Sequence, residues 1–173
     1  GCNAIWLNPC FVSPFHDAGY DVADYCHVAP RYGTNDTMRE LFEAAHQRGM
    51  HVILDLVPGH TSVDHPWFKA SMKQEKNEYS GRYIWAPSPS ESFTDVENLR
   101  GVLSGVSERG VCAVNFYSTQ PALNYGFAKP DKPWQCPVDS PDALATREAM
   151  KDVMRFWLLM GCDGFRVDMA GSL

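Results

Sequence analysis

The chain has 173 residues, of which 45% are hydrophobic and 21% are charged, and its formal net charge is −6. This length is enough for one sizeable hydrophobic core. The negative charge gives no electrostatic support for binding nucleic acid or an anionic membrane surface. No run of residues approaches the roughly 18 apolar positions that a membrane span needs. The composition therefore argues against nucleic-acid-binding and membrane proteins.

The six cysteines are scattered through the chain without any Cys-x-x-Cys spacing. Such a pattern is weak support for a disulfide framework and matches no zinc motif. We therefore expect buried or half-buried free thiols. Free thiols indicate a reducing compartment, so a cytoplasmic location is favoured.

The first half of the chain predicts two buried strands separated by a loop and a helix. Residues 3–7 (Asn-Ala-Ile-Trp-Leu) form a short apolar run closed by Asn-Pro, which is typical of a buried strand. A long loop is expected from about residue 11 to residue 34. Apolar residues then recur at helical spacing until Gly49, and residues 51–57 (His-Val-Ile-Leu-Asp-Leu-Val) predict a second strand. Because a strand follows Gly1 almost at once, we interpret the chain as a piece of a longer protein.

The second half predicts an irregular insertion, a helix and a third strand. Residues from about 60 to 139 show no sustained period, which indicates an inserted, irregular subdomain. Ser140-Pro141 is a typical helix start, Gly161 a stop, and residues 162–167 form another apolar run. Apolar strands alternating with amphipathic helices predict an α/β fold with a parallel sheet covered by helices. In such folds the chemistry collects at the carboxyl ends of the strands.

Arg166 and Asp168 form the most informative pair at such a strand end. Residues two apart on a strand point to the same side, so the two side chains share a face. The arginine can then hold the aspartate ionised and aimed, as a carboxylate nucleophile requires. A structural ion pair that closes the strand is the alternative interpretation, although burying such a pair is energetically costly.

Two other segments near strand ends carry candidate site residues. Asp17 and Tyr20 lie in an acidic, aromatic loop that suits a sugar, although a solvated loop with a half-buried tyrosine is the alternative. His60 follows the second strand after Pro-Gly, where a structural role competes with a functional one. Asp55 lies inside that strand and therefore needs a partner. The spacing of His60 from its neighbours matches no zinc-ligand pattern.

Four ordered motifs together resemble the α-amylase family (glycoside hydrolase family 13). Residues 164–170 (Gly-Phe-Arg-Val-Asp-Met-Ala) and 55–60 (Asp-Leu-Val-Pro-Gly-His) are similar to two of its short signatures. Residues 19–25, followed by 31–34 (Arg-Tyr-Gly-Thr), resemble the loop after its second barrel strand. Residues 120–124 (Gln-Pro-Ala-Leu-Asn) are similar to the signature near the end of its inserted B domain.

The resemblance implies a partial TIM (β/α)8 barrel that holds strands two to four. Residues 1–59 would contain barrel strands 2 and 3 with helix 2, residues 60–139 the inserted B domain, and residues 140–173 barrel helix 3 and strand 4. The family has a structural calcium site, but Gly59 has no side chain and Ala122 has no side-chain oxygen to offer a hard cation. The resemblance therefore implies no metal or other cofactor here. The Gln-Pro form of the B-domain signature favours the oligo-1,6-glucosidase and trehalose-synthase branch.

The resemblance also implies a role for each candidate residue. Asp168 would be the nucleophile that forms a covalent glycosyl-enzyme, and Arg166 would orient it. His60 would hydrogen-bond the sugar in the cleavage subsite, Tyr20 would stack on it, and Asp17 would grip its non-reducing end. The framework residues that shape the site would be Asp21 and Asp55.

The predicted function is that of a fragment of a retaining α-glucoside hydrolase or transglycosylase whose partner is an oligosaccharide. Retaining hydrolysis needs two carboxyl groups, and no glutamate follows a predicted strand here. The acid/base glutamate is expected beyond Leu173, in the remainder of the barrel, so the fragment alone is expected to be inactive. The alternative is a non-catalytic amylase-like scaffold for binding or interaction.

Overall fold

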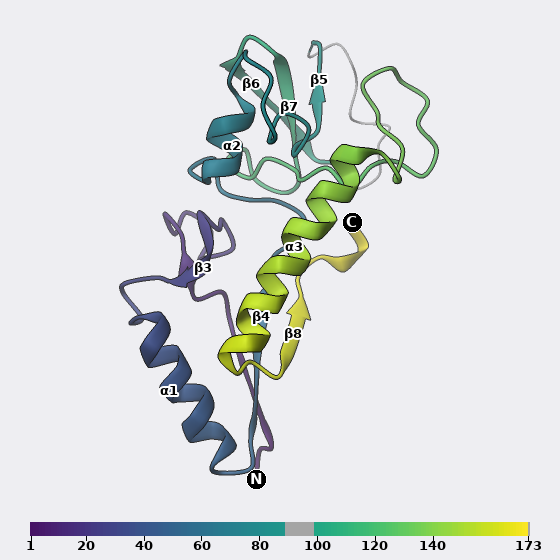
Figure 1. Ribbon diagram of the computed structural model, residues 1–173. Helices are drawn as coiled ribbons and strands as arrows, with labels where there is room; N and C mark the ends of the chain where they lie inside the picture. The colour runs from purple at the N-terminus through teal and green to yellow at the C-terminus, as the bar shows by residue number, and fades with distance from the viewer. Residues whose placement is uncertain (89–98, 173) are drawn as a thin grey trace.

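The computed structural model describes residues 1–88 and 99–172, and its centre is a parallel three-stranded sheet (Figure 1). The strands are β1 (Ala4–Leu7), β4 (His51–Leu56) and β8 (Gly164–Val167), in the order β1-β4-β8. Both neighbouring pairs run parallel. The three predicted strands and their parallel arrangement are thus confirmed, with bounds that shift by one or two residues.

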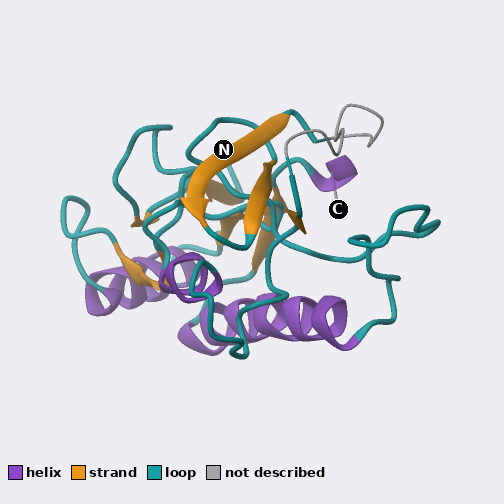
Figure 2. Ribbon diagram, turned by 90° about the horizontal axis from the view of Figure 1, so that it is seen from above, coloured by secondary structure: helices purple, strands orange, loops and turns teal. Residues whose placement is uncertain are grey.

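Two long helices cover one face of this sheet, α1 (Asn35–His46) and α3 (Pro141–Met160) (Figure 2). Both begin with a hydroxyl cap, since Thr34 accepts from the Thr37 amide and Ser140 from the Ala143 amide. Gly161, with φ of 115°, ends α3 in a left-handed conformation that favours glycine. The predicted start and stop of this helix are therefore confirmed. Within residues 1–88 and 99–172, no helix is long and apolar enough to cross a membrane.

The buried face of α3 matches the expected one in part. Helical spacing predicts an apolar face made of Leu144, Met150, Val153, Met154, Trp157 and Leu158. Met150, Val153 and Trp157 are buried, whereas Leu144 and Leu158 are 46% and 47% exposed. Small side chains, Ala143 and Thr146, take the buried positions in the first turns, and the Thr146 hydroxyl donates to the Asp142 carbonyl oxygen. Because a hydroxyl satisfied in this way can be buried at little cost, the first turns of the helix pack through a face that hydrophobicity alone does not identify.

The expected loop over residues 11–34 contains a short antiparallel hairpin. Its strands are β2 (Phe11–Val12) and β3 (Asp24–Val28), with an irregular register between them. The hairpin packs on α3, where the Trp157 indole donates to the Tyr25 carbonyl oxygen at 2.7 Å and lies 5.2 Å from the Phe11 ring. The prediction of a plain loop was wrong because β2 has only two residues and its register with β3 is irregular, so the pair shows no clear period in the sequence.

The segment between β4 and α3 has regular structure of its own. It contains α2 (Pro66–Ser71) and an antiparallel sheet in the order β5-β7-β6. The strands of this sheet are β5 (Trp85–Ala86), β6 (Gly101–Ser107) and β7 (Gly110–Val114). Figure 1 shows this layer beyond the carboxyl ends of β4 and β8. The expectation of an irregular subdomain over 60–139 was therefore wrong where this sheet forms, while residues 89–98 lie outside the described part.

All six cysteines lie in the described part of the chain, and each is an unpaired thiol. Cys10, Cys112 and Cys162 are buried, Cys26 and Cys136 are partly buried, and Cys2 is exposed. Burial raises the pKa of Cys10 to about 12, so that thiol stays protonated and unreactive at neutral pH.

Candidate active site

The carboxyl ends of β4 and β8 bring three charged groups together. Asp55 and Arg166 are direct neighbours across the two strands. The Arg166 Nη1 atom donates to Asp55 Oδ1 at 3.0 Å and to Asp168 Oδ1 at 2.7 Å. The Asp168 amide donates to the Leu56 carbonyl oxygen at 2.8 Å, which fixes the backbone just after β8. Arg166 and Asp168 thus share a face as predicted, and Arg166 is the partner that Asp55 needs.

Burial and pairing set the charge state of this cluster. The Asp55 side chain is fully buried, while the Asp168 side chain is 13% exposed. Burial raises the pKa of Asp55, and the hydrogen bonds from Arg166 and Tyr20 oppose that rise. The hydrogen bond to Asp55 raises the pKa of Arg166 further, so the guanidinium remains a cation. Of the two carboxylates, Asp55 and Asp168, only Asp168 can therefore be reached by a ligand.

Trp6 completes the surroundings of Arg166. The guanidinium carbon lies 5.2 Å from the centre of the Trp6 ring, within the range of a cation–π contact. Trp6 lies in β1, the strand that pairs with the other side of β4. Trp6 was not among the predicted site residues, although its place in the first predicted strand could have indicated a position near the site.

Tyr20 and His60 join the cluster from two loops. The Tyr20 hydroxyl donates to Asp55 Oδ2 at 3.3 Å, and His60 Nε2 lies 3.1 Å from the Tyr20 carbonyl oxygen. Only 2% of His60 is exposed, and this burial lowers its pKa below the ordinary value. The ring is then neutral at pH 7, and Nε2 must carry the hydrogen because it faces a carbonyl oxygen. His60 therefore fixes the loop that presents Tyr20.

The loop after β1 is organised around the buried carboxylate of Asp21. This carboxylate accepts from the Ser13 hydroxyl at 2.8 Å and from the backbone amides of His16 and Asp17 at 2.9 and 3.2 Å. Asp21 is fully buried, so these donors replace the water that the charge has lost. The geometry is that of a framework residue.

Asp17 has a partner from a distant segment. Its Oδ2 atom accepts from Gln120 Nε2 at 2.6 Å, across 103 positions of the sequence. From the sequence, Gln120 is recognisable only as part of a family signature, without a role of its own. The seven predicted site residues therefore form one connected set at the strand ends, to which the structure adds Trp6 and Gln120.

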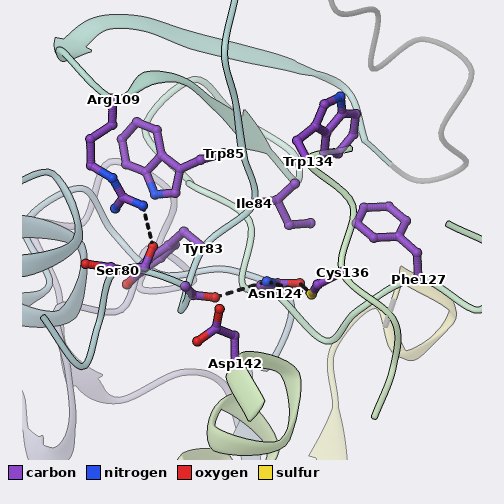
Figure 3. A pocket seen from close by; sticks show the side chains of 11 residues that line it. Ser80, Tyr83, Ile84, Trp85, Arg109, Asn124, Phe127, Trp134, Cys136 and Asp142 are labelled. Atoms are coloured by element: carbon purple, nitrogen blue, oxygen red, sulfur yellow. Dashed lines mark hydrogen bonds between the residues drawn. The ribbon is translucent and has the colours of Figure 1, made fainter. Parts of the chain in front are cut away.

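A separate cavity of about 170 Å³ lies next to the antiparallel sheet (Figure 3). Two of its polar side chains are used within the fold: Arg109 donates to the Ser80 carbonyl oxygen at 2.9 Å, and Asn124 donates to the Gly81 carbonyl oxygen at 3.0 Å. None of the seven predicted site residues lines this cavity. The candidate site is therefore the cluster at the strand ends.

The described residues contain no group of three or more His, Cys, Asp or Glu side chains placed to hold a metal ion. In the histidine-rich stretch after β4, the side chains that could bind a metal have other partners. His60 faces the Tyr20 carbonyl oxygen, and Asp64 pairs with Lys69 at 3.2 Å. The His65 Nδ1 atom accepts from the Trp67 amide at 3.1 Å, so the three side chains serve three separate purposes.

Comparison with known proteins identifies relatives across the whole chain. Residues 1–173 match the family model described as "Alpha amylase, catalytic domain". The chain is 40% identical over 177 residues to the trehalose synthase/amylase TreS of Mycobacterium tuberculosis, covering 97% of this chain and 26% of that protein. It is 36% identical over 174 residues to the oligo-1,6-glucosidase of Bacillus sp. strain F5, covering 100% of this chain and 32% of that protein.

Solved structures give the same picture. The trehalose-6-phosphate hydrolase of Bacillus licheniformis matches with a TM-score of 0.74 and 34% identity, over 96% of this chain and 28% of that one. The α-amylase from H. orenii matches with a TM-score of 0.74 and 37% identity, over 97% of this chain and 31% of that one. The chain thus spans about a quarter to a third of the length of these relatives, as a partial α/β unit of their TIM-barrel fold. It belongs to the α-amylase family.

Proposed function

We propose that the protein containing this chain is a retaining α-glucoside hydrolase or transglycosylase that acts on α-linked gluco-oligosaccharides. The observation that carries the proposal is Asp168, a partly exposed carboxylate held at a strand end by Arg166 at 2.7 Å. The names of the relatives support the substrate class, since they include an oligo-1,6-glucosidase and an enzyme described as trehalose synthase/amylase.

In the proposed reaction, an oxygen of Asp168 attacks the anomeric carbon of a glucosyl unit. The glycosidic carbon–oxygen bond breaks, and the leaving oxygen takes a proton from a general acid. Water or an acceptor sugar hydroxyl then attacks the same carbon, gives its proton to the now deprotonated acid, and releases Asp168. Arg166 stays charged throughout and keeps the carboxylate oriented.

The remaining residues are assigned to binding and framework roles. Tyr20 stacks on the glucosyl ring, and Asp17 grips its non-reducing end. His60 contacts the sugar. A sugar hydroxyl would then share the Nε2 hydrogen with the Tyr20 carbonyl oxygen, which lies 3.1 Å from Nε2. Asp21 and Asp55 are framework residues, supported by their complete burial.

We also propose how the chain divides. Residues 1–59 hold barrel strands 2 and 3, which are β1 and β4, and residues 140–173 hold helix 3 and strand 4, which are α3 and β8. Residues 60–139 form the B domain. The parallel order β1-β4-β8, with a separate antiparallel sheet contributed from between β4 and β8, supports this division.

The second carboxyl group of the mechanism is assigned to the remainder of the barrel. Retaining enzymes place their two carboxyl groups about 5–5.5 Å apart. Asp55 is not suited to this task, because it is fully buried and already bonded to Arg166 and Tyr20. Residues 1–173 alone are therefore proposed to be inactive.

We propose that the family's structural calcium does not bind at Gly59 and Ala122. The backbone oxygens there are already engaged: the Gly59 oxygen accepts from the Leu123 amide at 3.0 Å, and the Ala122 oxygen accepts from the Ile84 amide at 3.2 Å. Neither residue offers a side-chain oxygen in their place.

We also propose a cytoplasmic location, which the six unpaired thiols support.

The proposal is tested by trapping the full-length protein with a 2-deoxy-2-fluoro or 5-fluoro glucosyl fluoride and mapping the adduct by mass spectrometry. We expect a glucosyl ester on Asp168 and none in the Asp168→Asn variant. Labelling of another carboxylate would overturn the nucleophile assignment. Absence of both label and turnover would favour the alternative, a non-catalytic amylase-like scaffold that binds oligosaccharides.

A further inference from the structure

Gln120 is held rigidly on both sides of its side-chain amide. It is fully buried in the segment between β7 and α3. Its Oε1 atom accepts from the Tyr117 amide at 2.9 Å, and its Nε2 atom donates to Asp17 Oδ2 at 2.6 Å. Because the Tyr117 amide can only donate, the oxygen of the side-chain amide must face it, which leaves the NH2 group to face Asp17.

This contact links two segments that meet at the candidate site. Asp17 belongs to the loop after β1, and its backbone oxygen accepts from the Tyr20 amide at 2.8 Å. Gln120 donates to Oδ2 of the Asp17 carboxylate, and Asp17 is only partly buried, so a ligand can reach that carboxylate. A hydrogen bond to an ionised acceptor is short and strong, which suits a group that must hold a charge in a fixed direction.

We propose that Gln120 is a positioning residue that orients the Asp17 carboxylate toward hydroxyl groups of the terminal glucosyl unit. In this way it sets the affinity of the enzyme for that unit. The inference rests on the proposed function and extends it, because Gln120 acts through Asp17 rather than on the sugar itself.

The test uses the full-length protein and p-nitrophenyl α-D-glucopyranoside, with KM and kcat measured between pH 5 and pH 8. In Gln120→Glu the new carboxylate keeps the bond from the Tyr117 amide but meets Asp17 as a like charge. We expect KM to rise about 10- to 100-fold at pH 7, with a smaller change in kcat.

Acid should partly restore the Gln120→Glu variant. Two adjacent carboxylates raise the pKa of the pair, so as the pH falls they come to share one proton, and an O–H···O bond replaces the lost N–H···O bond. The ratio of its KM to that of the wild type should therefore fall as the pH is lowered. Gln120→Met, which neither donates nor titrates, should show a raised KM at every pH. A merely structural glutamine would give no such difference between the two variants.

Gln135→Glu is the matched control. Gln135 also accepts from a backbone amide through Oε1, at 2.7 Å from Asp131, but it does not contact the candidate site. Its kinetic constants should stay within about twofold of the wild type, as expected for a site outside the network. Thermal unfolding of every variant shows whether the fold is intact.

The outcomes separate the two proposals. Turnover with a KM that Gln120→Glu and Gln120→Met leave within twofold of the wild type overturns the role of Gln120 alone. The double variant of Asp17→Asn and Gln120→Met gives a second test. If Gln120 acts through Asp17, the double variant should raise KM by less than the product of the two single fold-changes. A fold-change equal to that product would also overturn the role of Gln120. Turnover of no α-glucoside by the wild type overturns both the proposed function and the inference.

Discussion

Arg166 meets two carboxylates through a single nitrogen atom, with Asp168 at 2.7 Å and Asp55 at 3.0 Å. Its planar group also lies over the Trp6 ring. Two carboxylates this close would repel each other without the cation between them. The arginine therefore both neutralises the pair and fixes the direction of Asp168.

Replacing Arg166 by lysine should show how far the orientation of Asp168 depends on the planar shape of the guanidinium group. A lysine keeps the positive charge, but its compact ammonium cannot reproduce the planar contact with Trp6 or the same reach to both carboxylates. We expect kcat of the full-length protein for p-nitrophenyl α-D-glucopyranoside to fall about 10²-fold or more, with a smaller change in KM. The matched control is Arg39→Lys, an exposed pair with Asp36 at 3.0 Å, which should change little. Equal kcat values for the two variants would contradict the orienting role of Arg166.

His65 shows how one element depends on a protonation state. It caps α2 by accepting the Trp67 amide at Nδ1, and its ring lies 4.5 Å from the Trp67 ring and 5.5 Å from the Tyr25 ring. Burial lowers its pKa from 6.5 to about 4. A protonated ring could no longer accept that hydrogen bond, so the helix start requires the neutral form.

The lowered pKa of His65 makes stability depend on pH. As pH falls below 6.5 the unfolded chain binds the proton first, so the free energy of unfolding is highest above 6.5 and declines toward pH 4. This group should contribute up to about 3 kcal/mol to that decline. His65→Asn keeps a good capping acceptor without titrating and should flatten the profile measured by chemical unfolding of the full-length protein.

The control for His65 is His27→Asn, because the His27 side chain is 66% exposed and its pairing with Asp24 is weakened by solvent. This variant should follow the wild-type profile. An unchanged slope in His65→Asn would show that other groups cause the acid sensitivity.

At the scale of elements, helix caps and apolar runs were predicted correctly because each depends on residues that lie close together in the sequence. The caps at Ser140 and Gly161 and the apolar runs of the three parallel strands specify their own conformation within a few residues. The hairpin and the antiparallel sheet were missed, since β2 and β5 have only two residues each and the registers of β2 with β3 and of β6 with β7 shift. The two-residue strands form only because more distant residues pair with them, Val28 with Phe11 and Cys112 with Trp85, and that pairing leaves no period in the sequence.

The parallel sheet as described has two unpaired edges, β1 and β8, and one face that neither α1 nor α3 covers (Figure 2). Trp6 on that face is 52% exposed, and Val167 in the edge strand is 39% exposed. Exposed edges invite pairing with another chain unless they are covered. In the proposed barrel, the remaining strands would cover both edges and enclose the open face.

Residues 1–173 expressed alone should therefore associate or precipitate. Light scattering coupled to size-exclusion chromatography should show species larger than one chain, whereas the full-length protein, run under the same conditions, serves as the control. A monodisperse monomer of residues 1–173 that unfolds cooperatively would contradict this expectation.

The sequence by itself determined the three parallel strands, the two long helices and the shared face of Arg166 and Asp168, because each depends on residues a few positions apart. Only the tertiary structure decided which groups meet: Asp55 with Arg166 across 111 positions, Asp17 with Gln120 across 103, and His60 with the Tyr20 carbonyl oxygen across 40. Periodicity fixes where a side chain points within its own element. Its partner is fixed by how elements pack, and no local spacing encodes that.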